Sequence, residues 1–321
     1  MKKNFFASTA WRGITSMFGI LFTFVLIASM ILNYFVPEIN VFMHTSSYEV
    51  IAGDGETEHY KSKYDTLQDL LSVKEALNIE IQEEGSVLLK NNGALPLAEN
   101  ERNITLLGVS SVNPGFCGKV GGAAMNDLKQ ALNIKTSFEV AGLTVNPKMW
   151  DWYLSCPYIT ESGLKRNVFT RSSIYAEMRI GEAPVSSYPD DNGFAEYNGA
   201  AVVVITRQGI EGSDLASDPT VGTGSDGAFG ITDGDGIHNA LQLHQQELDV
   251  IDLAISEFDK VIVLINSDNA MELQPLEELD GVDAILWIGS PGARGFIGVG
   301  NILTGAVSPS GRLVDAYPQH N

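Results

Sequence analysis

The sequence predicts an α/β fold: a mostly parallel β-sheet sandwiched by helices, flavodoxin-like, preceded by an N-terminal transmembrane helix. Four continuous apolar runs predict the strands: NITLLGV (103–109), AAVVVIT (200–206), VIVLIN (261–266) and AILWIG (284–289). Unbroken apolar strands are typical of a parallel sheet that is covered on both faces. Longer amphipathic stretches separate the runs, and strands that alternate with helices favour this class of sheet.

The first predicted element is a membrane-spanning helix over residues 14–36. No charged side chain lies between Arg12 and Glu38, and about 20 apolar residues suffice to cross a bilayer. Basic residues precede this run, so the positive-inside rule places residues 1–13 in the cytoplasm and the main domain outside the cell membrane. A cleaved signal peptide is the alternative, although its apolar region is usually shorter, about 7–15 residues.

Residues 37–76 are mixed and polar, and we interpret them as a stalk or extension before a domain over residues 77–321. A predicted helix and a short strand open that domain, in SVKEALNIEIQEEGSVLLKNNGALPL. The stretch ALQLHQQELDVIDLAISEF, between the second and third strand runs, has the apolar spacing of an amphipathic helix. MNDLKQALN and GFIGVGNILTG predict two further helices.

Composition argues against several functional classes. The net charge is −20 over 321 residues, which would repel nucleic-acid phosphates, so we expect no nucleic-acid partner. The two cysteines fit no CxxC pattern, which gives a metal site little support. GTGSDG (222–227) has the spacing of a dinucleotide-binding loop, but it lacks the preceding strand and the following helix that such a site needs. A nucleotide-binding protein is therefore disfavoured.

An acidic loop follows the second strand run, in ITRQGIEGSDLAS (205–217). Glu211 lies between Gly209 and Gly212, which allow unusual backbone angles and close approach of another surface. A glutamate on such a loop suits a general acid, because it can reach into a neighbouring site at the carboxyl end of a strand. On spacing alone, a polar surface loop with solvated acids is the favoured interpretation.

Five ordered segments change that balance, because together they resemble family 3 glycoside hydrolases. They are EEGSVLLKNNGALPL with the following NITLLGVSS, AVVVITRQGIEGSDL, LQLHQQELDVI, KVIVLINSDNAMEL, and VDAILWIGSPGARGFIGVGNILTGAVSPSGRLVDAYP. The resemblance covers about residues 77–318 and is to the C-terminal-type α/β sandwich domain of that family. It implies a retaining, β-glucosidase-like hydrolase, which uses one carboxyl group as nucleophile and another as acid/base.

The resemblance also implies roles for individual residues. Glu211 matches the acid/base glutamate of the family, and Asp214 matches an aspartate of the same loop with a role in structure or positioning. Arg207 is a third candidate, substrate-proximal or positioning, which would steer or pair with these acids. The implied substrate is an oligosaccharide or β-glucoside with a terminal β-linked sugar, and the chemistry needs no metal or organic cofactor.

The sequence departs from the family pattern in one essential part. The family's nucleophile is an aspartate in a Ser-Asp-Trp-like motif on a separate TIM-barrel domain, and no Ser-Asp-Trp occurs in this chain. The sandwich-like domain follows the predicted anchor directly, as in domain-permuted members, and the last family segment is missing. We therefore expect a truncated chain that is inactive alone and whose missing barrel packs on the sandwich domain. A non-catalytic, membrane-tethered carbohydrate-binding or scaffold module is the alternative.

Overall fold

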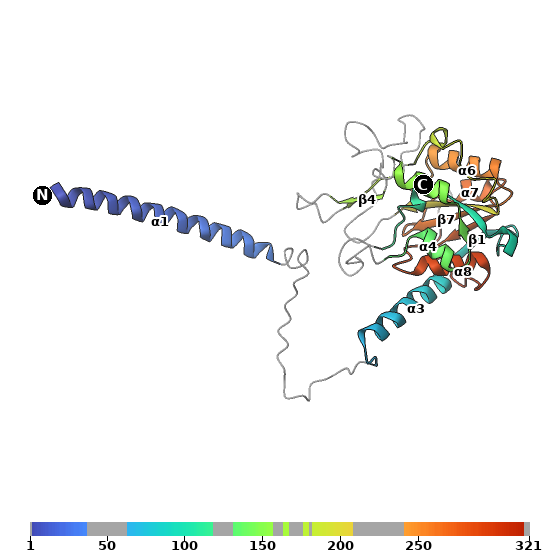
Figure 1. Ribbon diagram of the computed structural model, residues 1–321, viewed down its shortest axis with the longest axis horizontal. Coiled ribbons are helices and arrows are strands. Elements are labelled where there is room, and N and C mark those ends of the chain that lie inside the picture. The colour runs from blue at the N-terminus through green and yellow to red at the C-terminus, as the bar shows by residue number, and fades with distance from the viewer. Residues whose placement is uncertain are drawn as a thin grey trace. The chain divides into compact units, whose positions relative to one another are not determined.

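The computed structural model describes residues 2–36, 63–117, 131–156, 163–166, 176–179, 182–207 and 241–317. The chain divides into two units, Met1–Lys63 and Tyr64–Asn321. The first unit contains helix α1 (Lys2–Tyr34), whose part Thr9–Tyr34 is long and apolar enough to cross a membrane (Figure 1). A signal sequence near the N-terminus can also meet these criteria of length and composition.

The second unit is built on a six-stranded sheet with the order β1-β8-β7-β6-β2-β3. Its strands are β1 (Val87–Asn91), β2 (Asn103–Leu107), β3 (Thr144–Val145), β6 (Ala200–Arg207), β7 (Val261–Ser267) and β8 (Ala284–Trp287). Only β1 is antiparallel to its neighbour, β8; the other pairs are parallel. The parallel strands, numbered in chain order, lie as 2-1-3-4-5, which is the flavodoxin-like order. The predicted fold class is confirmed.

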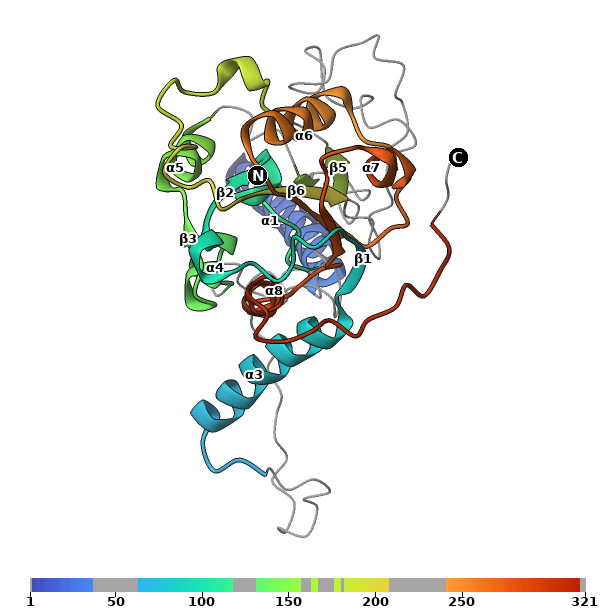
Figure 2. The same ribbon diagram turned by 90° about the vertical axis from the view of Figure 1, so that its right-hand side faces the viewer.

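Helices cover both faces of this sheet (Figure 2). One face carries α5 (Pro147–Ser155), α6 (Gln245–Glu257) and α7 (Gln274–Glu278). The other carries α4 (Ile134–Val140) and α8 (Gly295–Thr304), and α3 (Leu67–Gly85) packs on the outer side of α8. The remaining described elements are η1 (Glu99–Glu101), η2 (Val109–Ser111), η7 (Val185–Ser187) and a hairpin of β4 (Gly163–Arg166) and β5 (Ala176–Arg179).

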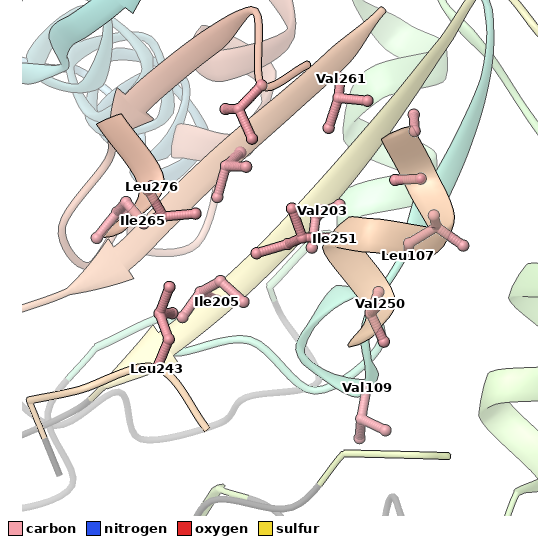
Figure 3. Close-up of a cluster of buried hydrophobic side chains, with 14 of the residues drawn as sticks. Leu107, Val109, Val203, Ile205, Leu243, Val250, Ile251, Val261, Ile265 and Leu276 are labelled. Carbon is pink, nitrogen blue, oxygen red and sulfur yellow. The ribbon is translucent and has the colours of Figure 1, made fainter. Parts of the chain in front are cut away.

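Strand β6 explains why the apolar runs are unbroken. Successive side chains of a strand point to opposite faces of the sheet. Val203 and Ile205 join the cluster under α6, where Figure 3 shows them near Ile251, whereas Val202 and Val204 join the cluster on the other face. Because helices cover both faces, each of these side chains is almost fully buried, and each contributes about 1.5–3 kcal/mol of hydrophobic stabilisation.

The four predicted strand runs all form strands, and their ends differ from the prediction by at most two residues. Helix α3 begins at Leu67, inside the segment 37–76 that we interpreted as a stalk, and runs across the predicted boundary at residue 77. The start is fixed by a capping box, in which Thr66 Oγ1 accepts from the Asp69 amide at 3.1 Å. The predicted helix MNDLKQALN lies mostly outside the described residues.

Helix α8 packs closely on α3 at Gly298, and Asn78 of α3 bonds to the segment at the start of α8. A Cβ at Gly298 would lie 2.8 Å from the carbonyl oxygen of Ile79, so only glycine allows α3 to approach this closely. Asn78 of α3 donates to the carbonyl oxygen of Pro291 and accepts from the amide of Arg294, both at 2.8 Å. The start of α8 is therefore held by the side of α3.

Candidate functional site

The carboxyl ends of β2 and β6 lie together where the strand order reverses. These strands are neighbours, yet the chain between them passes through β3 on the far side of β2. In open parallel sheets, ligands bind in the crevice at such a switch point. The candidate site is therefore this edge of the sheet, at Gly108 and Val109 after β2 and at Arg207, the last residue of β6.

Arg207, the last residue of β6, is a fully buried cation. Its Nη1 and Nη2 donate to the two carboxylate oxygens of Glu247 on α6, at 2.8 and 2.6 Å. Nη1 also donates to the carbonyl oxygen of Thr206 at 3.0 Å, and Nη2 donates to that of Gln242 at 2.8 Å. A buried charge is tolerated when it is both paired and hydrogen-bonded, and the guanidinium fork meets both conditions here.

Glu247 stays ionised although it is buried. Burial opposes the charged form, but the positive charge and hydrogen bonds of Arg207 outweigh this cost and hold the pKa of Glu247 below its ordinary value of 4.5. Glu247 is the third residue of α6, and its Oε2 also accepts from the backbone amide of His244 at 2.9 Å. A carboxylate at this position suits the positive end of the helix.

A second buried carboxyl group lies at the end of β2. Gly108 has a φ of +89°, and the next amide, that of Val109, donates to Glu182 Oε2 at 2.9 Å and to Oε1 at 3.1 Å. The amide of Ala183 donates to Oε1 at 2.8 Å. Burial nevertheless raises the pKa of Glu182 to about 8, and the negative charge of Glu247 adds to the rise. At neutral pH this carboxyl group is therefore mostly protonated.

Asn266 of β7 connects the segments at this edge of the sheet. Its Oδ1 accepts from Thr206 Oγ1 at 3.0 Å and from the amide of Gly115 at 2.6 Å. Its Nδ2 donates to the carbonyl oxygens of Gly115 and Gly289, at 2.9 and 2.5 Å. The ends of β6 and β7 and the segments after β2 and β8 thus share one buried amide, which fixes their relative positions.

The three predicted site residues have different outcomes. Arg207 is described, and it lies at the switch-point edge with Glu247 as its carboxylate partner. Glu211 and Asp214 lie outside the described residues, so their roles stay predictions. Among the residues that the structure describes, no group of three or more His, Cys, Asp or Glu side chains is placed to hold a metal ion.

Sequence reasoning missed two functional candidates. Glu247 occupies the glutamate position of the pattern L-x-L-x-x-x-E in LQLHQQE, which served only as a sign of family resemblance. A buried arginine at the end of β6 requires a carboxylate partner, and that requirement was the signal available. Glu182 follows no recognisable pattern in GEAPVSS, and only the fold brings it to the amide of Val109.

Comparison with known proteins gives a consistent family. Residues 86–321 match the family described as Glycosyl hydrolase family 3 C-terminal domain. A β-glucosidase of Ruminococcus albus is 24% identical over 240 residues, which cover 74% of this chain and 22% of that protein. A probable exo-1,4-β-xylosidase of Aspergillus fumigatus is 27% identical over 247 residues, 75% of this chain and 24% of that protein. The match thus spans about a quarter of the length of these relatives.

Solved structures agree with the sequence relatives. β-Glucosidase 3B from Thermotoga neapolitana, in complex with glucose, has a TM-score of 0.56 and 25% identity over 78% of this chain and 32% of that chain. A β-glucosidase from Paenibacillus barengoltzii also has a TM-score of 0.56, with 22% identity over 76% of this chain and 24% of that chain. The second likeness concerns the fold alone.

Proposed function

This chain belongs to glycosyl hydrolase family 3, of which it contains the C-terminal domain, and we propose that it supplies the acid/base of a retaining glycosidase. Its relatives are β-glucosidases and β-xylosidases, so the proposed substrate is an oligosaccharide or β-glucoside with a terminal β-linked sugar. The proposed acid/base is Glu211, with Asp214 and Arg207 as positioning residues. The chemistry uses carboxyl groups and water, and it needs no metal or organic cofactor.

One observation carries this proposal: β6 ends at the switch point of a flavodoxin-like sheet, and Glu211 follows its last residue, Arg207, by only four positions. A glutamate this close to the carboxyl end of a switch-point strand is where a ligand-facing group belongs in such a sheet. The alternative, a solvated surface loop without a catalytic role, gives no reason for the buried ion pair of Arg207 and Glu247 at the end of β6.

The proposed mechanism has two steps. In the first, an enzyme carboxylate attacks the anomeric carbon and forms a glycosyl–enzyme ester, while Glu211 protonates the departing glycosidic oxygen. In the second, water attacks the anomeric carbon while Glu211 takes its proton; the ester bond breaks, which releases the sugar and the carboxylate of the nucleophile. The two carboxyl groups of such a pair lie about 5–5.5 Å apart, so the nucleophile must be brought next to Glu211.

The nucleophile is proposed to come from a separate barrel domain that packs on this one. The sequence has no Ser-Asp-Trp, and the matched relatives are about four times longer than the matched region. The chain alone should therefore not hydrolyse an aryl β-glucoside at a rate above background. Robust turnover by the purified 321-residue chain would refute this part of the proposal.

The role of Glu211 is tested in the protein that the complete reading frame encodes. Glu211→Gln should slow aryl glycosides with poor leaving groups by about 10²–10⁴-fold, because only these need protonation of the leaving oxygen. For activated aryl glycosides, such as dinitrophenyl glycosides, the rate of the glycosylation step should fall far less. Equal losses for both classes would remove Glu211 from the acid role.

The apolar helix at the N-terminus supports a membrane attachment, and the basic residues before it support a placement of the hydrolase domain outside the cell. Carbonate extraction of membranes, followed by protease accessibility of intact cells, tests this placement. A membrane-tethered sugar-binding or scaffold role is the alternative to a catalytic one. Glucose binding by the isolated chain without turnover is the result expected for that role.

A further inference from the structure

Arg207 joins the two ends of the stretch that carries Glu211. It is the last described residue before residues 208–240, and Gln242 is the second described residue after them. The guanidinium donates to the carbonyl oxygen of Gln242 at 2.8 Å. The carbonyl oxygen of Arg207 itself accepts from the amide of Asp268 at 3.1 Å, beyond the end of β7. The side chain of Arg207 thus ties the end of β6 to residues 241–242, which we call the returning chain.

Glu247 sets the orientation of that side chain. Its two oxygens accept from both terminal nitrogens of the guanidinium, so the planar group cannot rotate without losing a bond of 2.8 or 2.6 Å. The carboxylate is itself fixed, because Oε2 also accepts from the His244 amide at the start of α6. The position of α6 is therefore transmitted through Glu247 to the end of β6.

The returning chain has a second support that does not involve Arg207. Gln242 Nε2 donates to Glu272 Oε2 at 3.0 Å, and the Glu272 amide donates to the carbonyl oxygen of Leu241 at 2.9 Å. These bonds remain when the charge of Glu247 is removed. Loss of Glu247 should therefore displace the guanidinium first, before the returning segment detaches from the domain.

We propose that Glu247 is a positioning residue for the acid/base, acting through Arg207 on the chain that leads to Glu211; this inference rests on the proposed function. Only four positions separate Arg207 from Glu211, and the bonds of the guanidinium to Glu247 and Gln242 fix the position of Arg207 at the end of β6. A general acid works within about 2.6–3.2 Å of its target oxygen. A small displacement of the acid therefore lowers the rate of proton transfer more than it lowers the affinity for the sugar.

The first experiment uses the 321-residue chain and hydrogen exchange measured by mass spectrometry. Glu247→Gln keeps the size of the side chain but removes the negative charge opposite Arg207. Amides of residues 241–250 should exchange faster than in the wild type, whereas those in the middle of β6 and β7 should not change. Glu257→Gln is the matched control, since it makes the same chemical change at an exposed position of the same helix. Unchanged exchange in Glu247→Gln would overturn the inference.

The second experiment uses the enzyme encoded by the complete reading frame. For a substrate with a poor leaving group, Glu247→Gln should lower kcat by up to about 10²-fold, with KM within about twofold of the wild type. For an activated aryl glycoside, kcat should stay within a few-fold of the wild type. A merely structural role predicts equal losses on both substrates, through a smaller fraction of folded enzyme, and that result would overturn the inference.

Arg207→Lys provides an independent variant if Glu247→Gln does not fold. Lysine keeps a positive charge opposite Glu247 but lacks the fork that also reaches Gln242, so the loss that depends on the leaving group should persist. If the activity of Arg207→Lys equals that of the wild type on both substrates, the inference is overturned. The failure of the proposed function can be told apart from the failure of this inference. If the loss in Glu211→Gln does not depend on the leaving group, the proposed function itself fails. If the loss in Glu211→Gln depends on the leaving group but the losses in Glu247→Gln and Arg207→Lys do not, only the inference fails.

Discussion

The buried carboxyl group of Glu182 should make the stability of this domain fall as the pH rises from about 4.5 to 8. Its pKa is about 8 in the folded chain, against an ordinary value of 4.5, so the unfolded chain ionises it first. The folded state must then keep a proton that the unfolded state has released. The contribution of Glu182 to stability is therefore fully present below pH 4.5 and is lost as the pH approaches 8.

The magnitude follows from the two pKa values. A difference of about 3.5 between 4.5 and 8 corresponds to about 5 kcal/mol when it is fully developed, at 1.36 kcal/mol for each pKa unit. Between pH 5 and 7.5, about 3 kcal/mol of this loss should develop. Glu182→Gln has no proton to lose, and its Oε1 can still accept from the amide of Ala183. The variant should lack this part of the pH dependence.

The assay is urea unfolding of the purified chain, followed by tryptophan fluorescence at several pH values. The free energy of unfolding of Glu182→Gln minus that of the wild type should rise by about 3 kcal/mol between pH 5 and 7.5. Glu99→Gln, at an exposed position, controls for the general effect of removing a negative charge. Parallel curves for Glu182→Gln and the wild type would show that the buried carboxyl group is not held protonated, and the reasoning would be wrong.

Three further predictions concern the scaffold. Thr66→Ala should remove the cap of α3 and weaken its first turn by about 1 kcal/mol, seen as faster hydrogen exchange there and not in the sheet. Gly199→Ala should destabilise the domain by about 1–3 kcal/mol or more in urea unfolding, because its Cβ would lie 2.1 Å from a backbone carbonyl oxygen. Gly85→Ala is its control, since nothing lies within 4 Å of that Cβ, and it should be neutral or slightly stabilising. Asn266→Ala should lower the melting temperature by several degrees, because it leaves buried partners on three segments, at Thr206, Gly115 and Gly289, unsatisfied. An unchanged melting temperature would contradict the shared role of this amide.

The sequence predicts the central strands well because their environment is uniform. Strands β6 and β7 are covered on both faces, so every position is apolar until the polar residues that end each strand. Strand β3 has only two residues, Thr144 and Val145, and no pattern distinguishes so short a strand. The hairpin of β4 and β5 was also not predicted, since segments of four residues carry too little periodicity.

The site was predicted in part, for a different physical reason. The family resemblance draws attention to Glu211 and Arg207, which lie in one continuous segment. The partner of Arg207 is 40 positions further along the chain, and Glu182 meets the amide of Val109 across 73 positions. Contacts at such separations are set by the strand order of the sheet, which local patterns do not contain.

The attachment of α3 to α8 has a mechanical consequence. The chain from the apolar N-terminal helix reaches the domain through the start of α3, so a pulling force on that chain is transmitted along this helix. Asn78 bonds to Pro291, and Asn301 of α8 donates to Glu83 at 2.6 Å, so the contacts between the helices are loaded in shear and share the force. The sheet lies on the other side of α8 and would not be peeled strand by strand. Tension applied to the chain before α3 is therefore carried first by the contacts between α3 and α8, ahead of the strand pairs of the sheet.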